Sequence, residues 1–188
     1  MPNNRKALDN LLVKVDRAYK HIIHLNTAFL RFLAEGGPYE TIFEDNPNTS
    51  ERTYYVRVRK ETPPQFSALI GDVAQNLRSS LDHLAWHLVQ NSPVIPKARD
   101  RDSYFPIFET ASKYNAGKMR KIQGMTDAAI QAIDRIQPYY GIDGVGIGHG
   151  AQLFWLDEIN KLDKHRLLVP IWGNMISHTI PRLRHFRQ

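Results

Sequence analysis

The sequence contains no cysteine among its 188 residues. This absence excludes disulfide bonds, thiol nucleophiles and thiolate metal ligands, and it is typical of proteins in a reducing compartment such as the cytoplasm. No apolar run approaches the ~20 residues that a membrane-spanning helix needs. The first twenty residues also lack the apolar centre of a signal peptide. We therefore expect a cytoplasmic protein that does not bind membranes.

The composition is that of a folded domain. Hydrophobic residues make up 42% of the chain, which is too many for a wholly disordered protein. The length of 188 residues suits one domain with a buried core. Lysine and arginine exceed aspartate and glutamate by 25 to 19, a formal net charge of +6. This charge favours an anionic partner but does not identify one.

Steps of three and four residues between apolar positions predict two long helices. The first covers about residues 4–35, and we interpret its apolar residues as one face: Leu8, Leu11, Leu12, Val15, Ala18, Ile22, Leu25, Phe29 and Phe32. The second runs from about 65 to 91. Shorter helices are expected over 127–137, where Thr126 is a suitable N-cap, and over 151–166.

The remaining segments read as strands, loops and a tail. Alternating side chains predict a hairpin near 39–60, and Gly173-Asn174 is a candidate turn between two short strands. The connection over 93–112 is rich in proline, and we expect Phe105 to Phe108 to pack onto the core. The prediction is a single mostly α domain over 1–188. It comprises a bundle of about four helices, a small antiparallel β-hairpin and a basic C-terminal tail over 166–188.

The second long helix carries an unusual polar face. At ~100° per residue, one narrow arc opposite the apolar face contains Asp72, Asn76, Ser79, His83 and His87. Arg78 and Asp82 flank this arc four residues apart, so they can form an ion pair. Short polar side chains and histidines suit fixed hydrogen bonds, and we expect this face to contact another element or a ligand.

The stretch from Arg78 to His83 resembles the R-x-x-x-x-H signature of the HEPN superfamily, helical proteins that include many metal-independent endoribonucleases. The resemblance implies that Arg78 holds the scissile phosphate and His83 transfers protons, with Ser79 and Asp82 as orienting groups. Arg78 and His83 point ~140° apart along one helix, so the resemblance also implies a homodimer with a composite site. It further implies an RNA-binding protein, and a bacterial toxin or defence function.

Two alternatives remain open. The pair His83 and His87 has the (i, i+4) spacing of metal ligands, which would make the chain a metal-dependent hydrolase. The other alternative is a non-catalytic helical-bundle scaffold or interaction protein. In that case Arg78–Asp82 is a surface ion pair, His83 is a buried hydrogen-bonded histidine, and the polar face is a dimer interface.

The later helix and the tail supply further candidates. Asp157 and Lys161 are expected to pair across one turn of the helix. The candidate binding residues, which would complete a polar pocket or contact RNA, are Asn76, His87, His165, Arg166, Arg182 and Arg184. The glycine-rich stretch 141–150 follows no predicted strand and precedes no Lys-Ser/Thr pair, so we expect a connecting loop and no nucleotide cofactor.

Overall fold

The computed structural model describes residues 2–49, 51–141, 150–165 and 178–181. In chain order the elements are α1 (Pro2–Ala34), β1 (Tyr39–Asn46), β2 (Glu51–Val58), α2 (Pro64–Gln90), the 3₁₀ turn η1 (Asp100–Asp102), α3 (Ala111–Ile122), α4 (Asp127–Asp134), the 3₁₀ turn η2 (Pro138–Gly141), α5 (Ala151–His165) and β3 (His178–Pro181). The predicted mostly α fold with a β-hairpin is confirmed. None of the described helices is both long and apolar enough to cross a membrane.

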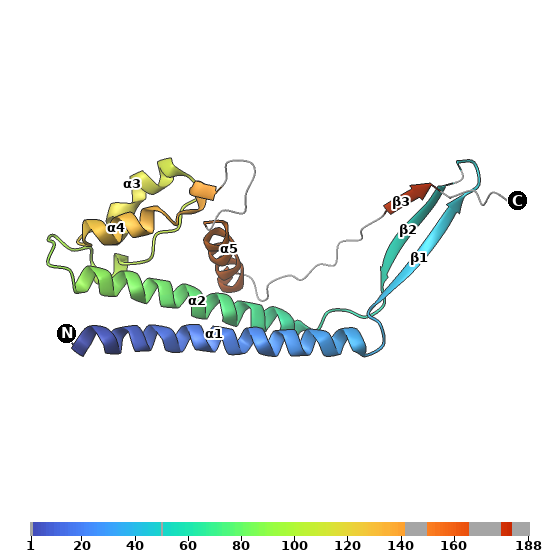
Figure 1. The fold of residues 1–188 in the computed structure, drawn as a ribbon, viewed down its shortest axis with the longest axis horizontal. Helices are drawn as coiled ribbons and strands as arrows, with labels where there is room; N and C mark the ends of the chain where they lie inside the picture. Colours follow the sequence, from blue (N-terminus) through green and yellow to red (C-terminus); the bar gives the residue numbers. More distant parts are fainter. Residues whose placement is uncertain (1, 50, 142–149, 166–177, 182–188) are drawn as a thin grey trace, which may run out of the picture.

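Helices α1 and α2 form a long antiparallel pair that sets the elongated shape of the molecule (Figure 1). The chain leaves α1 through Gly36 and Gly37, whose φ angles of 87° and 55° lie in the left-handed region that favours glycine. Pro64 then starts α2, at a position where its missing N–H has no helical partner to lose. Both boundaries agree with the sequence prediction to within about two residues.

The β strands form an arm at one end of the helix pair (Figure 1). Strands β1 and β2 pair antiparallel from Tyr39 opposite Val58 to Asn46 opposite Glu51, which confirms the predicted hairpin. Strand β3 adds to the free edge of β2 and completes a three-stranded sheet. The predicted turn at Gly173-Asn174 lies outside the described residues.

The main apolar core lies where α3, α4 and the segment that contains Ala98 and Phe105 cover the C-terminal half of α2, on the side of α2 away from α1, while α5 lies against the middle of α2 (Figure 1). Its buried residues are Ala85, Val89, Ala98, Phe105, Tyr114, Ile122, Met125 and Ile133. The predicted packing of Phe105 onto the core is confirmed. Thr126 caps α4 as predicted, because its hydroxyl accepts a hydrogen bond from the Ala129 N–H at 3.4 Å.

Helix α3 was not predicted. Its sequence is strongly polar and has few large apolar residues, of which only Tyr114 and Ile122 are fully buried, so the apolar signal for a helix is weak. The local signal that was present is Thr110, whose hydroxyl accepts from the Lys113 N–H and caps the first turn. The helix is further stabilised by burial of these two side chains in the core, and this burial depends on residues that are distant in the sequence.

Candidate functional site

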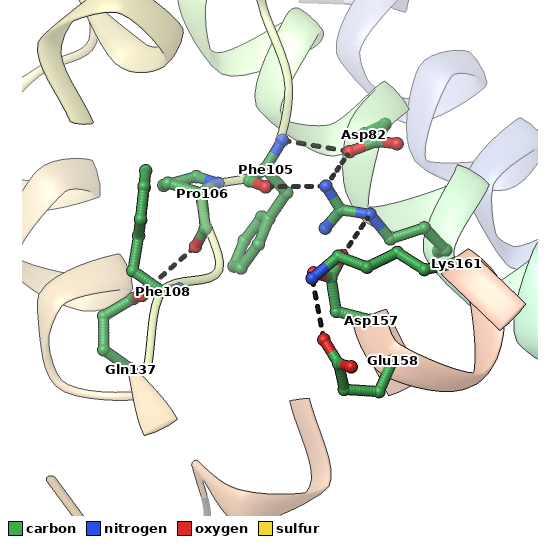
Figure 2. A network of polar contacts seen from close by, with 9 residues as sticks. Asp82, Phe105, Pro106, Phe108, Gln137, Asp157, Glu158 and Lys161 are labelled. Atoms are coloured by element: carbon green, nitrogen blue, oxygen red, sulfur yellow. Dashed lines mark hydrogen bonds and ion pairs between the residues drawn. The ribbon is translucent and has the colours of Figure 1, made fainter. Parts of the chain in front are cut away.

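Arg78, in the middle of α2, is the centre of a buried polar network (Figure 2). Only 8% of the residue is exposed. Its Nη2 donates to the Phe105 carbonyl at 3.0 Å and lies 3.1 Å from Asp82 Oδ1. Its Nε lies 3.4 Å from Asp157 Oδ1 on α5. A planar guanidinium suits this role because it can hold several acceptors at fixed angles.

The partners of Arg78 are themselves held in place. Asp82 accepts a hydrogen bond from the Phe105 N–H at 3.1 Å. Lys161 lies 2.9 Å from Asp157 Oδ2 and 2.7 Å from Glu158 Oε1, and Figure 2 shows this chain of contacts. The network therefore ties α2 to α5 and to the segment that contains Phe105.

Two predicted ion pairs are thus confirmed, but their setting differs from the prediction. Arg78–Asp82 was expected at the surface in the scaffold hypothesis, whereas the guanidinium is buried between α2, α5 and Phe105. His83 was expected to be buried in the same hypothesis, and it is exposed. Both details were wrong because the helical wheel alone does not show where α5 and Phe105 pack.

Gln137 is a structural residue that sequence reasoning missed. It is fully buried, and its Nε2 donates to the carbonyls of Pro106 at 2.8 Å and Ile133 at 3.3 Å. Its Oε1 accepts from the Phe108 N–H at 3.3 Å (Figure 2). The Gln137 amide therefore satisfies backbone groups of the irregular segment 106–108, as a neighbouring strand would do in a sheet. The only local signal was its position before Pro138, where a helix must end.

Burial shifts the pKa values of two charged groups in and beside the network, Asp82 and Lys121. Burial raises the pKa of Asp82 above its ordinary value of 3.8, and the attraction of Arg78 only partly offsets this effect. Burial and the nearby charge of Arg78 lower the pKa of Lys121 on α3. The Lys121 ammonium lies 5.0 Å from the centre of the Phe108 ring, as a cation–π contact.

Beside the network lies a cavity of about 270 Å³ between α3, α5 and the segment after Phe105. Its charged lining residues are Glu109, Lys113, Lys121, Asp157, Glu158 and Lys161. Three cations thus face three carboxylates, and Lys113 and Lys161 are engaged in ion pairs. Among the described lining residues the charges therefore balance, and they supply no net positive charge with which to attract a phosphate.

The predicted polar arc on α2 lies at the surface or close to it. Asp72 and His83 are exposed, while Asn76, Ser79 and His87 are partly buried. The Asn76 amide donates to the Asp72 carbonyl within the same helix, at 2.7 Å. The structure therefore brings Arg78 and Asp82 together but leaves Arg78 and His83 on different sides of α2, one buried and one exposed.

The remaining candidates separate into two groups. Among the described residues, no three His, Asp or Glu side chains are close enough to hold a metal ion, so His83 and His87 have no third ligand there. Arg166, Arg182, Arg184 and the side chain of His165 lie outside what the structure describes. Their predicted roles in a polar pocket or an RNA contact stay predictions.

The apolar residues of α1, interpreted above as one face, divide into two. Leu11, Ala18, Leu25 and Phe32 pack toward α2 at intervals of seven residues. A second set of eight residues is exposed. Seven of them are apolar, with between 38% and 63% of each residue accessible, and the eighth is Asn26. We call this set the α1 row: Leu8, Leu12, Val15, Tyr19, Ile22, Asn26, Phe29 and Leu33.

One end of the α1 row borders a groove on the helix pair. The groove has a volume of about 350 Å³ and lies between α1 and α2. It is lined by Leu8, Leu11, Leu12 and Val15 from α1 and by Ser80, Leu81 and Leu84 from α2. Exposed apolar surface of this extent is typical of a binding site.

Comparison with known proteins adds no further identification, because the chain matches no protein-family model, no curated protein and no solved structure.

Proposed function

We propose that this chain is a non-catalytic interaction protein, a helical scaffold whose α1 row docks a partner. The observation that carries the proposal is the exposure of seven large apolar side chains in line along one helix. Solvated helices normally place polar residues on the side away from their packing partner. A row of exposed leucine, isoleucine and aromatic side chains is favourable only when another surface covers it.

The Arg78 network supports the same proposal. The Arg78 guanidinium already contacts two carboxylates and the Phe105 carbonyl, all within the chain. The HEPN resemblance would require this group to bind a phosphate, but Nη1, the guanidinium nitrogen without a hydrogen-bond partner among the described residues, is buried. A role in holding α5 and Phe105 against α2 uses the contacts as they are.

Site-specific photo-crosslinking tests the proposal. A photoreactive amino acid replaces Tyr19, which is in the α1 row and 63% exposed, in the full chain inside the cells that produce it. The matched control replaces Val13, which is 64% exposed on the same helix but outside the row. We expect a discrete protein adduct from position 19 and none from position 13.

Three results bear on this proposal. No adduct from position 19, or equal adducts from both positions, would contradict a specific docking surface. Cleavage of mixed cellular RNA in EDTA by the wild type, but not by His83→Ala, would also contradict it and favour a metal-independent ribonuclease. An adduct from position 19 alone, with no cleavage, supports the interaction protein whatever the partner is.

A further inference from the structure

The spacing of the α1 row is that of a coiled coil. From Leu8 to Leu33 the steps are four, three, four, three, four, three and four residues. In heptad terms Leu12, Tyr19, Asn26 and Leu33 occupy the a positions, and Leu8, Val15, Ile22 and Phe29 occupy the d positions. Seven of the eight residues are apolar, and all eight are exposed.

The centre of this row is distinct from the face that α1 buries inside the chain, although the ring of Phe29 also packs edge-on against Phe66 of α2, with the ring centroids 6.1 Å apart. At ~100° per residue, the centre of the row lies roughly 80° around the helix from Leu11, Ala18, Leu25 and Phe32, which pack toward α2. A helix with two apolar faces at such an angle is typical of a bundle in which each helix has two neighbours. The described chain supplies only one of these neighbours along the row's length.

We propose that the second neighbour is α1 of a second copy of this chain, so that the two α1 helices form a parallel coiled-coil homodimer along the α1 row. The inference rests on the proposed function, because it names the partner of the same surface. It places the dimer interface on α1, not on the polar face of α2.

The area of the row suits a stable dimer. From their exposed fractions, the seven apolar side chains expose on the order of 600 Å² per copy. Two copies would bury at most about 1,200 Å² from these residues alone, which reaches the lower end of stable specific interfaces. Ile23 and Leu30 are also exposed and lie beside the row at the e position, so they extend the apolar contact.

Asn26 argues for a copy of the same chain and for the parallel direction. In a parallel homodimer a positions face each other, so the two Asn26 amides would lie opposite one another and could hydrogen-bond. In the fully overlapping antiparallel arrangement Asn26 would face Val15, which has no polar group to pair with a buried amide. A single asparagine at an a position is a known device for setting register and the number of strands.

The surroundings of the row leave room for the partner helix. Helices α3, α4 and α5 lie on the side of α2 away from α1, so they do not cover the row (Figure 1). The groove between α1 and α2 continues the apolar surface onto Leu81 and Leu84. The partner's α1 would therefore contact both helices near the N-terminal end of the row.

The test measures the mass of the full chain in solution, by light scattering and sedimentation. We expect a dimer at micromolar concentration. Ile22→Lys places a charge at a d position, and because each dimer loses two buried isoleucines, the dissociation constant should rise by at least about a hundredfold. Ile22 is 44% exposed in the single chain, so helix content should stay unchanged. Val13→Lys, outside the row, is the matched control and should dimerise like the wild type.

The relative direction of the two α1 helices is tested by cysteine crosslinking. Because the chain contains no cysteine, every disulfide must come from the introduced residues. Leu12→Cys should form a disulfide with its own copy in a parallel dimer, since facing a positions are close enough for the bond. Val13→Cys should not. In an antiparallel dimer Leu12→Cys would instead link only to Phe29→Cys in a mixed sample.

The outcomes separate this inference from the proposed function. A monomeric wild type, a dimer that survives Ile22→Lys, or a disulfide only between positions 12 and 29 would overturn the parallel α1 dimer. If position 19 then still crosslinks to a different protein in cells, the docking function stands and only the second copy is wrong. If no adduct forms, both are wrong.

Discussion

Replacing Arg78 by methionine tests whether the buried network holds the helical part of the fold together. Methionine keeps much of the length and apolar volume of the arginine stem but removes the charge and the donors. The change would leave the Phe105 carbonyl without its side-chain donor and Asp82 without its cation. Asp157 would lose one of its two cations and keep Lys161.

The structure sets the size of the expected effect. The side chains of Asp82 and Asp157 are only 24% and 15% exposed, so water compensates little for the lost cation. Removing one partner of a buried ion pair is destabilising by about 3–5 kcal/mol. Because both carboxylates keep another contact, we expect the lower end, about 3 kcal/mol. For a chain of this size that corresponds to a fall in the melting temperature of about 6–12 °C.

The assay is thermal and urea denaturation followed by circular dichroism, with Lys113→Met as the control. Lys113 pairs with Glu109 at 2.8 Å, closer than either ion pair of Arg78, but both partners are largely exposed. Exposed pairs contribute little, so the control should melt like the wild type. Equal melting temperatures for Arg78→Met and the wild type would refute the reasoning. A loss of RNA cleavage without a loss of stability would assign Arg78 to catalysis instead.

Three further predictions concern residues around the network. Since the pKa of Asp82 is raised in the folded chain, the stability linked to its protonation is present below about pH 4 and is lost as the pH rises through the raised pKa. In urea titrations, the free energy of unfolding of the wild type, measured relative to that of Asp82→Asn, should therefore fall between pH 4 and neutrality. A rise would mean that the attraction of Arg78 affects the pKa of Asp82 more than burial does. Gln137→Leu should lower the free energy of unfolding by about 2–3 kcal/mol, because the Phe108 N–H and the Pro106 carbonyl lose their partner; an unchanged denaturation midpoint would contradict this. Gly150→Ala should be destabilising by about 1–3 kcal/mol, since its new Cβ would overlap the backbone at Gln137 and Pro138, and a variant with unchanged melting would show that this junction can shift.

The boundaries of the long elements could be predicted because their signals are local. The exit of α1 depends on Gly36 and Gly37, the start of α2 on Pro64, and the cap of α4 on Thr126, each within a few residues of the boundary. The hairpin was predictable from alternation along 39–60. Helix α3 was not, because its segment has few large apolar residues and its stability comes from the core that it covers.

The sequence by itself determined that α1 is a helix with apolar residues at three- and four-residue steps and that Arg78 and Asp82 can pair. Only the tertiary structure decided that these apolar residues form two faces, with Leu11, Ala18, Leu25 and Phe32 against α2 and the α1 row exposed. It likewise decided that Arg78 is buried, because its partners Phe105 and Asp157 lie on segments distant in the chain. The physical reason is the same in both cases. Periodicity shows which side chains share a face of a helix, but burial depends on which other segment covers that face.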